Sequence, residues 1–393
     1  MQAVELRLPG NYWDSLLYNG RLYLFTRNGE IEVHNWDAIV TGLGWRDDLK
    51  PLAWHFLARG TAWYSTEVQQ LLRSPATADH LSALAAELSS KQRIIGSRLL
   101  ARSLERIVES PAHPHNDIVA YSNNVYVCGS SGVYEAALSH SDAMDFNRII
   151  DAPTMRMAAS YKTLALAAGS DGLLEQSLTE RWDGSEATQL SGNYCQNCSW
   201  LRFDLVGTSH GDSPGFLAAF SNPNWLSDKG EASRSLLGIV DADQLFGRSE
   251  GYMFSAGDQL VLVHDGIMEM DAWNPYRRRK YSGVDIGHSL LTHETISNKR
   301  LRNSGTIIDA AASVFGFVIE QEESLLVLAN DGTTKRLPEP VNWRCFPRSN
   351  RYVNHLHVTF EDHIRIYAFI HDYFLEGAER GPASNRPRSS FTA

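Results

Sequence analysis

Residues 164–176 read LALAAGSDGLLEQ, an apolar run, a small polar residue followed by glycine, and a second run. Asp-Gly and Asn-Gly pairs tolerate the positive φ angles of tight hairpin turns, and the flanking residues are strand formers. The stretch therefore predicts a β-hairpin. Four more copies have the same arrangement: RLYLFTRNGEIEV (21–33), VYVCGSSGVYEA (125–136), LVLVHDGIMEM (260–270) and LLVLANDGTTKRL (325–337).

A short apolar strand precedes each of these hairpins, at residues 15–18, 117–121, 157–160, 251–255 and 316–320. Each unit thus predicts three antiparallel strands, and a fourth fits before the next unit begins. Two weaker copies occupy residues 201–220 and 355–370. The turn glycines at 132, 172, 215, 266 and 332 are spaced as expected for four-stranded blades that carry insertions.

Seven such units predict an all-β fold, a seven-bladed β-propeller over residues 1–378. The chain resembles the β-propeller repeat superfamily, WD40-like in the broad sense. The strict WD40 signature is absent, because Trp-Asp pairs occur only at Trp13-Asp14, Trp36-Asp37 and Trp182-Asp183, not in each unit, and Gly287-His288 is the only Gly-His pair. Six or eight blades fit the pattern too, and the strands at 355–370 are an alternative closing clasp for the first blade.

A helical insertion is predicted over residues 65–110, between the first two blades. Thr77 or Asp79 offers an N-cap, and Leu81, Leu84 and Leu88 recur near the helical period. Gly96 costs about 1 kcal/mol relative to alanine inside a helix, so two shorter helices fit the segment as well. The tail at residues 379–393 has almost no large apolar residues and is predicted to be disordered.

The composition excludes several classes of protein. With 43% apolar and 21% charged residues the chain is of ordinary globular type, and its net charge of −10 disfavours coating of nucleic acid or anionic membrane. The sequence has neither a secretory signal nor an apolar stretch that spans a bilayer. Four scattered cysteines agree with a reducing compartment, so a cytoplasmic protein is expected.

Two groups of residues are weak candidates for a metal site. Cys195 and Cys198 have the spacing of half a zinc site, but no second half follows. His113, His115 and Asp117 immediately precede the first strand of a unit, where loop residues could ligate a divalent cation. His355 and His357 alternate along a strand and so share one face. A packing role or contact with solvent explains this pair more simply than a metal site does. We therefore predict no cofactor, with zinc or another divalent cation as the open alternative.

Three basic clusters are candidate partner-binding residues. Arg98, Arg102 and Arg106 fall on one predicted helical stripe, Arg277, Arg278 and Arg279 precede Lys280, and a third cluster spans residues 299–302. Basic clusters of this kind have three alternative roles: they bind phosphate groups, attract an acidic protein partner, or simply face solvent.

These features predict a non-catalytic scaffold that binds protein partners within a multi-subunit assembly through its loop face and helical insertion. No catalytic residue is assigned, because no GxSxG, P-loop, HExxH or Rossmann pattern occurs. A metal-dependent propeller hydrolase or lyase that uses His113, His115 or Asp117 is the first alternative. Nucleic-acid binding through the arginines is the second.

Overall fold

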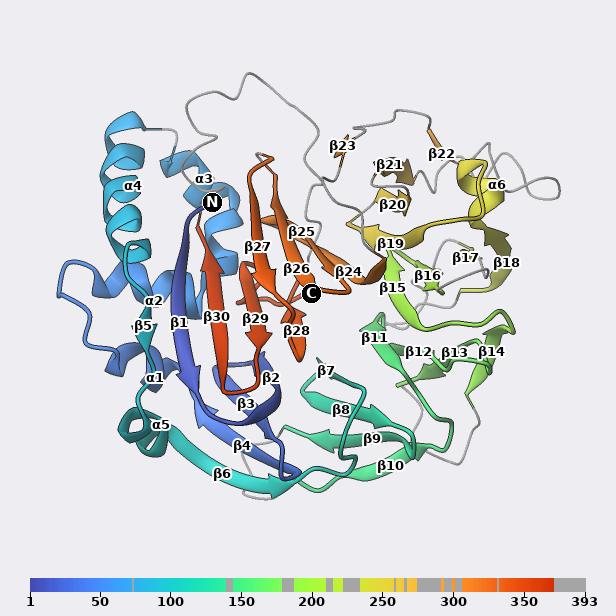
Figure 1. The fold of residues 1–393 in the computed structure, drawn as a ribbon, viewed down its shortest axis with the longest axis horizontal. Helices are drawn as coiled ribbons and strands as arrows, with labels where there is room; N and C mark the ends of the chain where they lie inside the picture. Colours follow the sequence, from blue (N-terminus) through green and yellow to red (C-terminus); the bar gives the residue numbers. More distant parts are fainter. Residues whose placement is uncertain are drawn as a thin grey trace. The chain divides into compact units, whose positions relative to one another are not determined.

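A computed structural model describes residues 1–72, 74–138, 144–178, 187–209, 215–221, 234–257, 259–264, 267–273, 291–292, 299–300, 306–330 and 332–370. The strands of these residues form seven sheets of four or five strands, and the fold is a seven-bladed β-propeller (Figure 1). The chain divides into two compact units, Met1–Ser110 with Ala310–Ala393, and Pro111–Asp309. Among the described residues, no helix has the length and apolar character needed to cross a lipid bilayer.

The first unit contains the blades formed by the two ends of the chain. Blade 1 is the sheet of β2 (Tyr12–Tyr18), β3 (Arg21–Thr26), β4 (Glu30–Asn35) and β6 (Leu104–Glu109). Blade 6 is the sheet of β24 (Ile307–Ser313), β25 (Gly316–Gln321), β26 (Ser324–Ala329) and β27 (Thr334–Pro338), and the boundary between the units lies inside β24. Blade 7 is the sheet of β28 (Asn342–Cys345), β29 (His355–Thr359), β30 (His363–Phe369), β1 (Ala3–Pro9) and β5 (Arg93–Ile94).

The second unit contains blades 2 to 5. Blade 2 is the sheet of β7 (Asp117–Tyr121), β8 (Asn124–Gly129), β9 (Gly132–Ala137) and β10 (Asn147–Ile150). Blade 3 is the sheet of β11 (Arg156–Ser160), β12 (Thr163–Ala167), β13 (Leu173–Ser177) and β14 (Thr188–Ser191). Blade 4 is the sheet of β15 (Asn197–Leu201), β16 (Asp204–Thr208), β17 (Phe216–Phe220) and β18 (Leu236–Asp241). Blade 5 is the sheet of β19 (Tyr252–Ala256), β20 (Gln259–His264), β21 (Ile267–Trp273), β22 (Leu291–Thr292) and β23 (Lys299–Arg300).

The hairpin signals coincide with the turns of the structure. Gly29, Gly132, Gly172 and Gly332 all have positive φ and join consecutive strands of their blades. Asp265-Gly266 and Asp331 lie outside the described residues, although strands flank both positions. The weaker copies at 201–220 and 355–370 form β16 with β17 and β29 with β30. All seven predicted units therefore correspond to blades.

The chain ends meet in blade 7. β1 pairs antiparallel with β30 along its whole length, from Ala3 opposite Phe369 to Pro9 opposite His363. The N-terminal strand thus completes the last blade, whereas the alternative clasp would have had the C-terminal strands complete the first. Apolar side chains packed between consecutive sheets form the core, as where Val318 and Leu325 of blade 6 meet Leu356, Val358 and Tyr367 of blade 7.

The predicted helical segment is present, but its bounds differ from the predicted residues 65–110, and it does not lie between the first two blades. It consists of α1 (Trp36–Gly42), α2 (Lys50–Ala58), the 3-10 helix η1 (Gly60–Tyr64), α3 (Thr66–Leu71), α4 (Pro75–Ser89) and α5 (Ser97–Ser103). It lies inside blade 1, between β4 and β6, because residues 104–109 are a strand paired with β4 and not helix. α4 begins after Ser74 rather than at Thr77 or Asp79, and Gly96 separates the last helix as the N-cap of α5. A further helix, α6 (Ala242–Phe246), follows β18.

Candidate functional site: polar strand starts and the helical segment

In four blades a polar residue lies at or near the start of the first strand, and its side chain fixes the backbone there. The backbone N–H of Ser15 donates to Asp14 Oδ1 at 2.7 Å, and that of Ile118 donates to Asp117 Oδ1 at 2.8 Å. Asn197 and Asn342 accept in the same way from the N–H of the next residue, at 2.8 Å each. The sequence signal for this position is an Asp or Asn directly before the apolar run of a unit.

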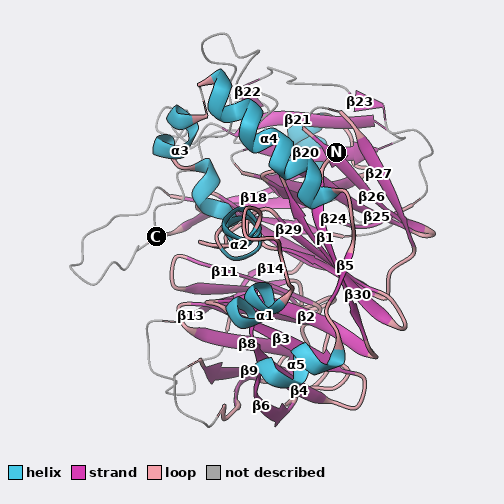
Figure 2. Ribbon diagram, turned by 90° about the vertical axis from the view of Figure 1, so that its left-hand side faces the viewer, coloured by secondary structure: helices cyan, strands magenta, loops and turns pink. Residues whose placement is uncertain are grey.

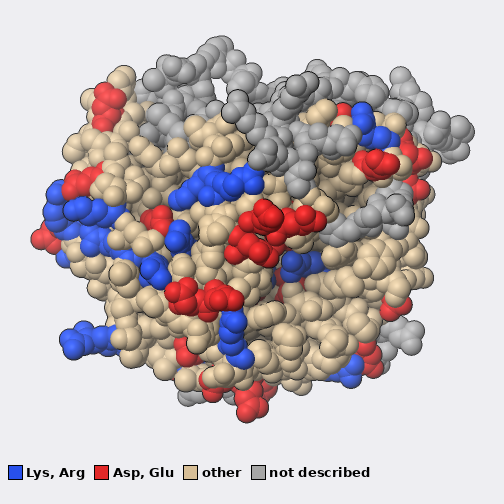
Figure 3. Space-filling model, in the orientation of Figure 1, with Lys and Arg blue, Asp and Glu red and all other residues tan. Residues whose placement is uncertain are grey.

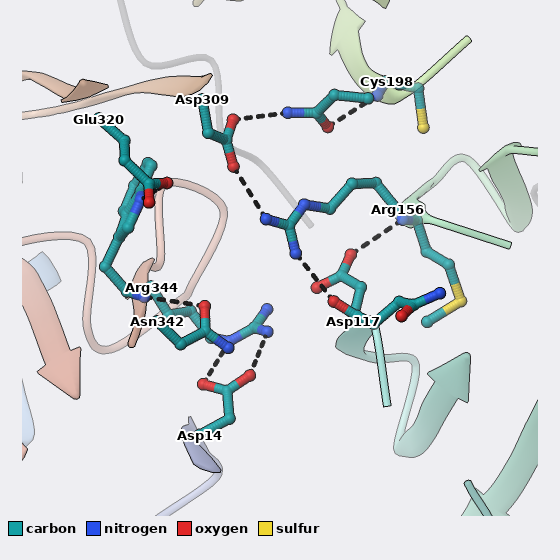
Figure 4. Close-up of polar contacts among 12 residues, drawn as sticks. Asp14, Asp117, Arg156, Cys198, Asp309, Glu320, Asn342 and Arg344 are labelled. Atoms are coloured by element: carbon teal, nitrogen blue, oxygen red, sulfur yellow. Dashed lines mark hydrogen bonds and ion pairs between the residues drawn. The ribbon is translucent and has the colours of Figure 1, made fainter. Parts of the chain in front are cut away.

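In the second unit the first residues of β11, β15 and β19 converge on Asp309 (Figure 4). Asn197 Nδ2 donates to Asp309 Oδ1 at 2.7 Å, and the hydroxyl of Tyr252 donates to the same oxygen at 3.0 Å. Arg156 Nη2 forms an ion pair with Asp309 Oδ2 at 3.2 Å. Burial raises the pKa of Tyr252 well above its usual value, so this hydroxyl stays a donor.

In the first unit the corresponding cluster is built around Asp14 (Figure 4). Arg344 Nη2 lies 2.7 Å from Asp14 Oδ2, and the Asp14 side chain is almost completely buried. The next residue of β2, Ser15, forms a 2.8 Å hydrogen bond between its hydroxyl and His357 Nδ1. Trp343 Nε1 donates to Glu320 Oε2 at 2.7 Å. These contacts join four strands, β2 of blade 1, β25 of blade 6, and β28 and β29 of blade 7, and they stabilise the fold.

The candidate cation residues His113, His115 and Asp117 lie in different environments. His113 is exposed, whereas His115 and Asp117 are buried. Asp117 uses both carboxylate oxygens on backbone groups, because Oδ2 also accepts from the N–H of Met157 at 2.9 Å. The carboxylate that was a candidate ligand therefore ties β7 to β11.

Both thiols of the Cys195–Cys198 pair are buried. Cys195 Sγ donates to the carbonyl of Asn197 at 3.2 Å, and Cys198 Sγ donates to that of Ala165 at 3.7 Å. Burial raises the pKa of Cys195 to about 12 and that of Cys198 well above its usual value. Metal binding requires thiolates, which this environment disfavours. Within the described ranges no three His, Cys, Asp or Glu side chains are placed to hold a metal ion, and zinc stays a prediction.

The arginines predicted to form one helical stripe are divided between two elements. Arg98 and Arg102 lie on α5 and are exposed, whereas Arg106 lies on β6 and is half-buried. The prediction of a single stripe is wrong, because pairing of β6 with β4 ends the helix at Ser103. Arg277, Arg278 and Arg279 lie outside the described residues, as do the side chains of the cluster at 299–302.

Helix α2 of the helical segment packs against β1 and β30 of blade 7 (Figure 2). Trp36 Nε1 donates to the carbonyl of Leu57 at 2.7 Å, and Asn354 Nδ2 donates to the carbonyl of Phe56 at 3.2 Å. Phe56 is fully buried and stacks on Trp63 with ring centroids 4.9 Å apart. Helix α2 is therefore part of the core of this unit.

The outer side of the same segment carries exposed apolar and basic side chains. Leu71 of α3 and Ile94 of β5 are 66% and 61% exposed. Basic side chains gather at the left edge of Figure 3, on the side where Figure 1 draws α2, α4 and β5. In the helical segment Arg46 pairs with both Asp48 and Glu87, at 2.6 Å each.

No protein-family model matches this chain, and no curated protein matches it. Similar solved structures include BBS1N in complex with ARL6DN, with 9% identity over 95% of this chain and 100% of that chain and a TM-score of 0.48. The computationally designed Ika8 protein has 10% identity over 94% and 100% of the two chains and a TM-score of 0.42. BamB from Moraxella catarrhalis has 10% identity over 90% and 80% and a TM-score of 0.39. At these values the likeness carries no argument about function, and the propeller fold rests on the seven sheets themselves.

Proposed function

We propose that this chain is a non-catalytic propeller scaffold that binds protein partners within a multi-subunit assembly. The proposal is carried by the helical segment at residues 36–103. β4 and β6 are neighbouring antiparallel strands, and a short turn suffices to join such neighbours. The chain instead inserts six helices at this point, so closure of the sheet does not account for them.

The two sides of the segment support this proposal. The inner side is anchored through Phe56, Trp63 and Asn354, which gives a rigid mount. The outer side leaves Leu71 and Ile94 largely exposed. Large apolar side chains on a rigid surface, near basic residues, are typical of protein interfaces.

Co-purification from the native host tests the proposal. The tagged full chain is isolated after nuclease treatment, together with a variant in which Leu71 and Ile94 are both replaced by aspartate. We expect a partner in stoichiometric amount with the full chain, and its loss from the double variant. Both positions are exposed, so far-UV circular dichroism should be the same for the two proteins.

A second variant serves as a control for charge alone. Thr188 and Gln189 on the outer strand of blade 3 are exposed, and their replacement by aspartate adds the same charge in the other unit of the chain. This control should retain the partner. A full chain that is recovered alone contradicts the proposal, and a bound metal in that preparation would favour the hydrolase alternative.

A further inference from the structure

Two exposed side chains of the second unit, Met155 and Tyr194, form one continuous apolar surface. Each is 38% exposed, and the hydroxyl of Tyr194 donates to Met155 Sδ at 3.9 Å. Both lie beside Gly169, since a Cβ on this glycine would be 3.1 Å from Met155 Cε and 3.8 Å from Tyr194 Cε2. We call these three residues the Tyr194 patch. Exposed methionine and tyrosine side chains in mutual contact are typical of binding surfaces.

The backbone of the Tyr194 patch is held by hydrogen bonds between separate segments of the chain. The N–H of Gly169 donates to the carbonyl of Cys195 at 2.8 Å, and the N–H of Cys195 donates to the carbonyl of Gly169 at 3.0 Å. The N–H of Met155 donates to the carbonyl of Ala167 at 2.8 Å. The patch is therefore preorganised, and a partner does not have to order it on binding.

Acidic side chains that lack a cation lie beside the patch. Asp171 is exposed two residues after the patch glycine, and Asp241 accepts a 3.4 Å hydrogen bond from Asn193, which directly precedes the patch tyrosine. Burial first, and the carboxylate of Asp243 second, raise the pKa of Asp241. Within the part of the chain that the structure describes, none of these three carboxylates forms an ion pair.

The arginines of the segments that carry the patch and its acids do not cancel this charge. Residues 148–156, 168–172, 192–196 and 241–251 contain no lysine. Each of their arginines has an acidic partner: Arg148 pairs with Asp151 at 3.0 Å, Arg156 with Asp309 at 3.2 Å, and Arg248 with Glu269 at 3.8 Å. The uncompensated charge beside the patch is therefore negative, which favours a cationic partner and disfavours nucleic acid.

We infer that the Tyr194 patch binds a basic segment of a partner protein. A lysine or arginine of that segment packs on the Tyr194 ring, which attracts cations, and its charge faces Asp171 and Asp241. An apolar residue next to it in the partner covers Met155. The inference goes beyond the proposed function, because that function is carried by the helical segment of the first unit.

Peptide selection with a depletion step tests this inference. A phage library of random twelve-residue peptides is first depleted on a variant that combines Tyr194→Ser with Asp171→Asn, which removes peptides that bind elsewhere. It is then selected on the wild-type full chain, and the affinity of each surviving peptide is measured by fluorescence anisotropy. The proteins compared are wild type, Tyr194→Ser, the double variant Asp171→Asn with Asp241→Asn, and the matched control Glu322→Gln with Glu323→Gln.

The aspartate variants change the charge and keep the local backbone. Asparagine replaces aspartate well in turns and at the N-cap of a helix, and these are the positions of Asp171 and Asp241. The control removes two acids that are exposed in the turn between β25 and β26 of the first unit. Equal unfolding midpoints check that each variant is folded.

We expect surviving peptides in which lysine or arginine is next to an apolar or aromatic residue. Tyr194→Ser should weaken their binding at least roughly tenfold, which corresponds to about 1.4 kcal/mol. The aspartate double variant should weaken it roughly fivefold or more, and should remove most of the affinity loss that wild type shows between about 50 and about 300 mM salt. The glutamate control should bind as wild type does.

Three results would overturn the inference: no peptide survives depletion, the surviving peptides lack basic residues, or the aspartate double variant leaves affinity and its salt dependence unchanged. The surviving peptides should also bind the Leu71→Asp, Ile94→Asp variant as tightly as wild type. A weaker affinity there would place the peptides on the helical segment instead. A native partner that is lost from that variant, in a protein for which no peptide survives depletion, would overturn this inference and leave the scaffold function intact.

Discussion

At the scale of single residues, the two histidines of β29 make stability depend on pH. His355 and His357 are fully buried. Burial lowers the pKa of His355 to about 3 and that of His357 well below its usual value. The unfolded chain protonates histidine near pH 6.5. The folded state therefore binds fewer protons, so stability is complete above about pH 6.5 and falls as the pH drops toward the folded-state pKa.

Replacement of His357 by asparagine should reduce this pH dependence. Asparagine retains a hydrogen-bonding atom near Nδ1, which meets Ser15, but it does not titrate. Each buried histidine contributes about 1.4 kcal/mol per pH unit to the slope of the unfolding free energy below pH 6. We expect urea unfolding between pH 7.5 and 5 to show a slope smaller by about this amount. An unchanged slope would mean that His357 is accessible to protons in the folded state.

Arg344 should be important for stability. Its loss in Arg344→Met leaves the Asp14 carboxylate buried and without its cation, and breaking a buried pair costs about 3 kcal/mol. The exposed pair of Arg46 with Asp48 is the matched comparison, and Arg46→Ala should leave the unfolding free energy nearly unchanged. Urea unfolding at pH 7.5 measures both. Equal effects of the two substitutions would contradict the structural role of the Asp14 cluster.

The polar strand starts show which site residues a sequence reveals. Asp14, Asp117, Asn197 and Asn342 each precede an apolar run, so an alignment of the units would have found them. Local spacing instead suggested Asp117 as a metal ligand. The convergence of Arg156, Asn197 and Tyr252 on Asp309 depends on contacts between strands that are far apart in the chain, which local patterns do not contain.

At the scale of elements, tight turns depend on glycine for two separable reasons, backbone strain and lack of space. A Cβ on Gly172, in the hairpin turn of blade 3 where φ is +83°, would lie 2.0 Å from the carbonyl oxygen of Ser191, whereas Gly247, the C-cap of α6 with φ of +71°, has nothing within 4 Å. Alanine at Gly247 should cost about 1 kcal/mol from backbone strain alone. Alanine at Gly172 should cost at least about 3 kcal/mol, because the backbone clash is added. Thermal unfolding compares the two, and equal losses would exclude the clash.

The sequence predicts the boundaries of an element well where a local pattern sets them, and poorly where pairing with a distant strand sets them. The first strand of blade 2, DIVAY, matches β7 residue for residue. The stretch LERIVE falls inside the helix predicted over residues 65–110 from its apolar periodicity, and the spacing of Arg98, Arg102 and Arg106 fits that helix. Its pairing with β4 overrides that spacing.

At the scale of the whole molecule, the N-terminal strand is needed to complete blade 7. Val4, Leu6 and Leu8 of β1 are fully buried. A variant that lacks residues 1–10 loses their burial, worth about 1.5–3 kcal/mol for each side chain, and exposes the edge of β30. We expect a loss of about 5 kcal/mol or more in urea unfolding, together with self-association in sedimentation. A truncated chain with the wild-type unfolding midpoint would contradict this closure.

The number of blades was predictable, but the closure was not. Every blade contains a hairpin with its own local signal, so counting the signals predicts seven blades. β1 carries no turn signal, and its partner β30 lies at the other end of the chain. Because no local pattern identifies β1 as the partner of β30, residues 355–370 by themselves also fit a clasp in which the C-terminal strands complete the first blade.

The mass of the native assembly tests the scaffold proposal most directly. The tagged protein is released from its host by gentle lysis with nuclease, and its particle mass is measured by sedimentation at near-physiological salt. The account predicts a particle heavier than a single chain, with at least one other protein in fixed ratio, that returns to single-chain mass in the Leu71→Asp, Ile94→Asp variant. A wild-type protein that sediments as a single chain, or a particle that contains only copies of this chain, would contradict it.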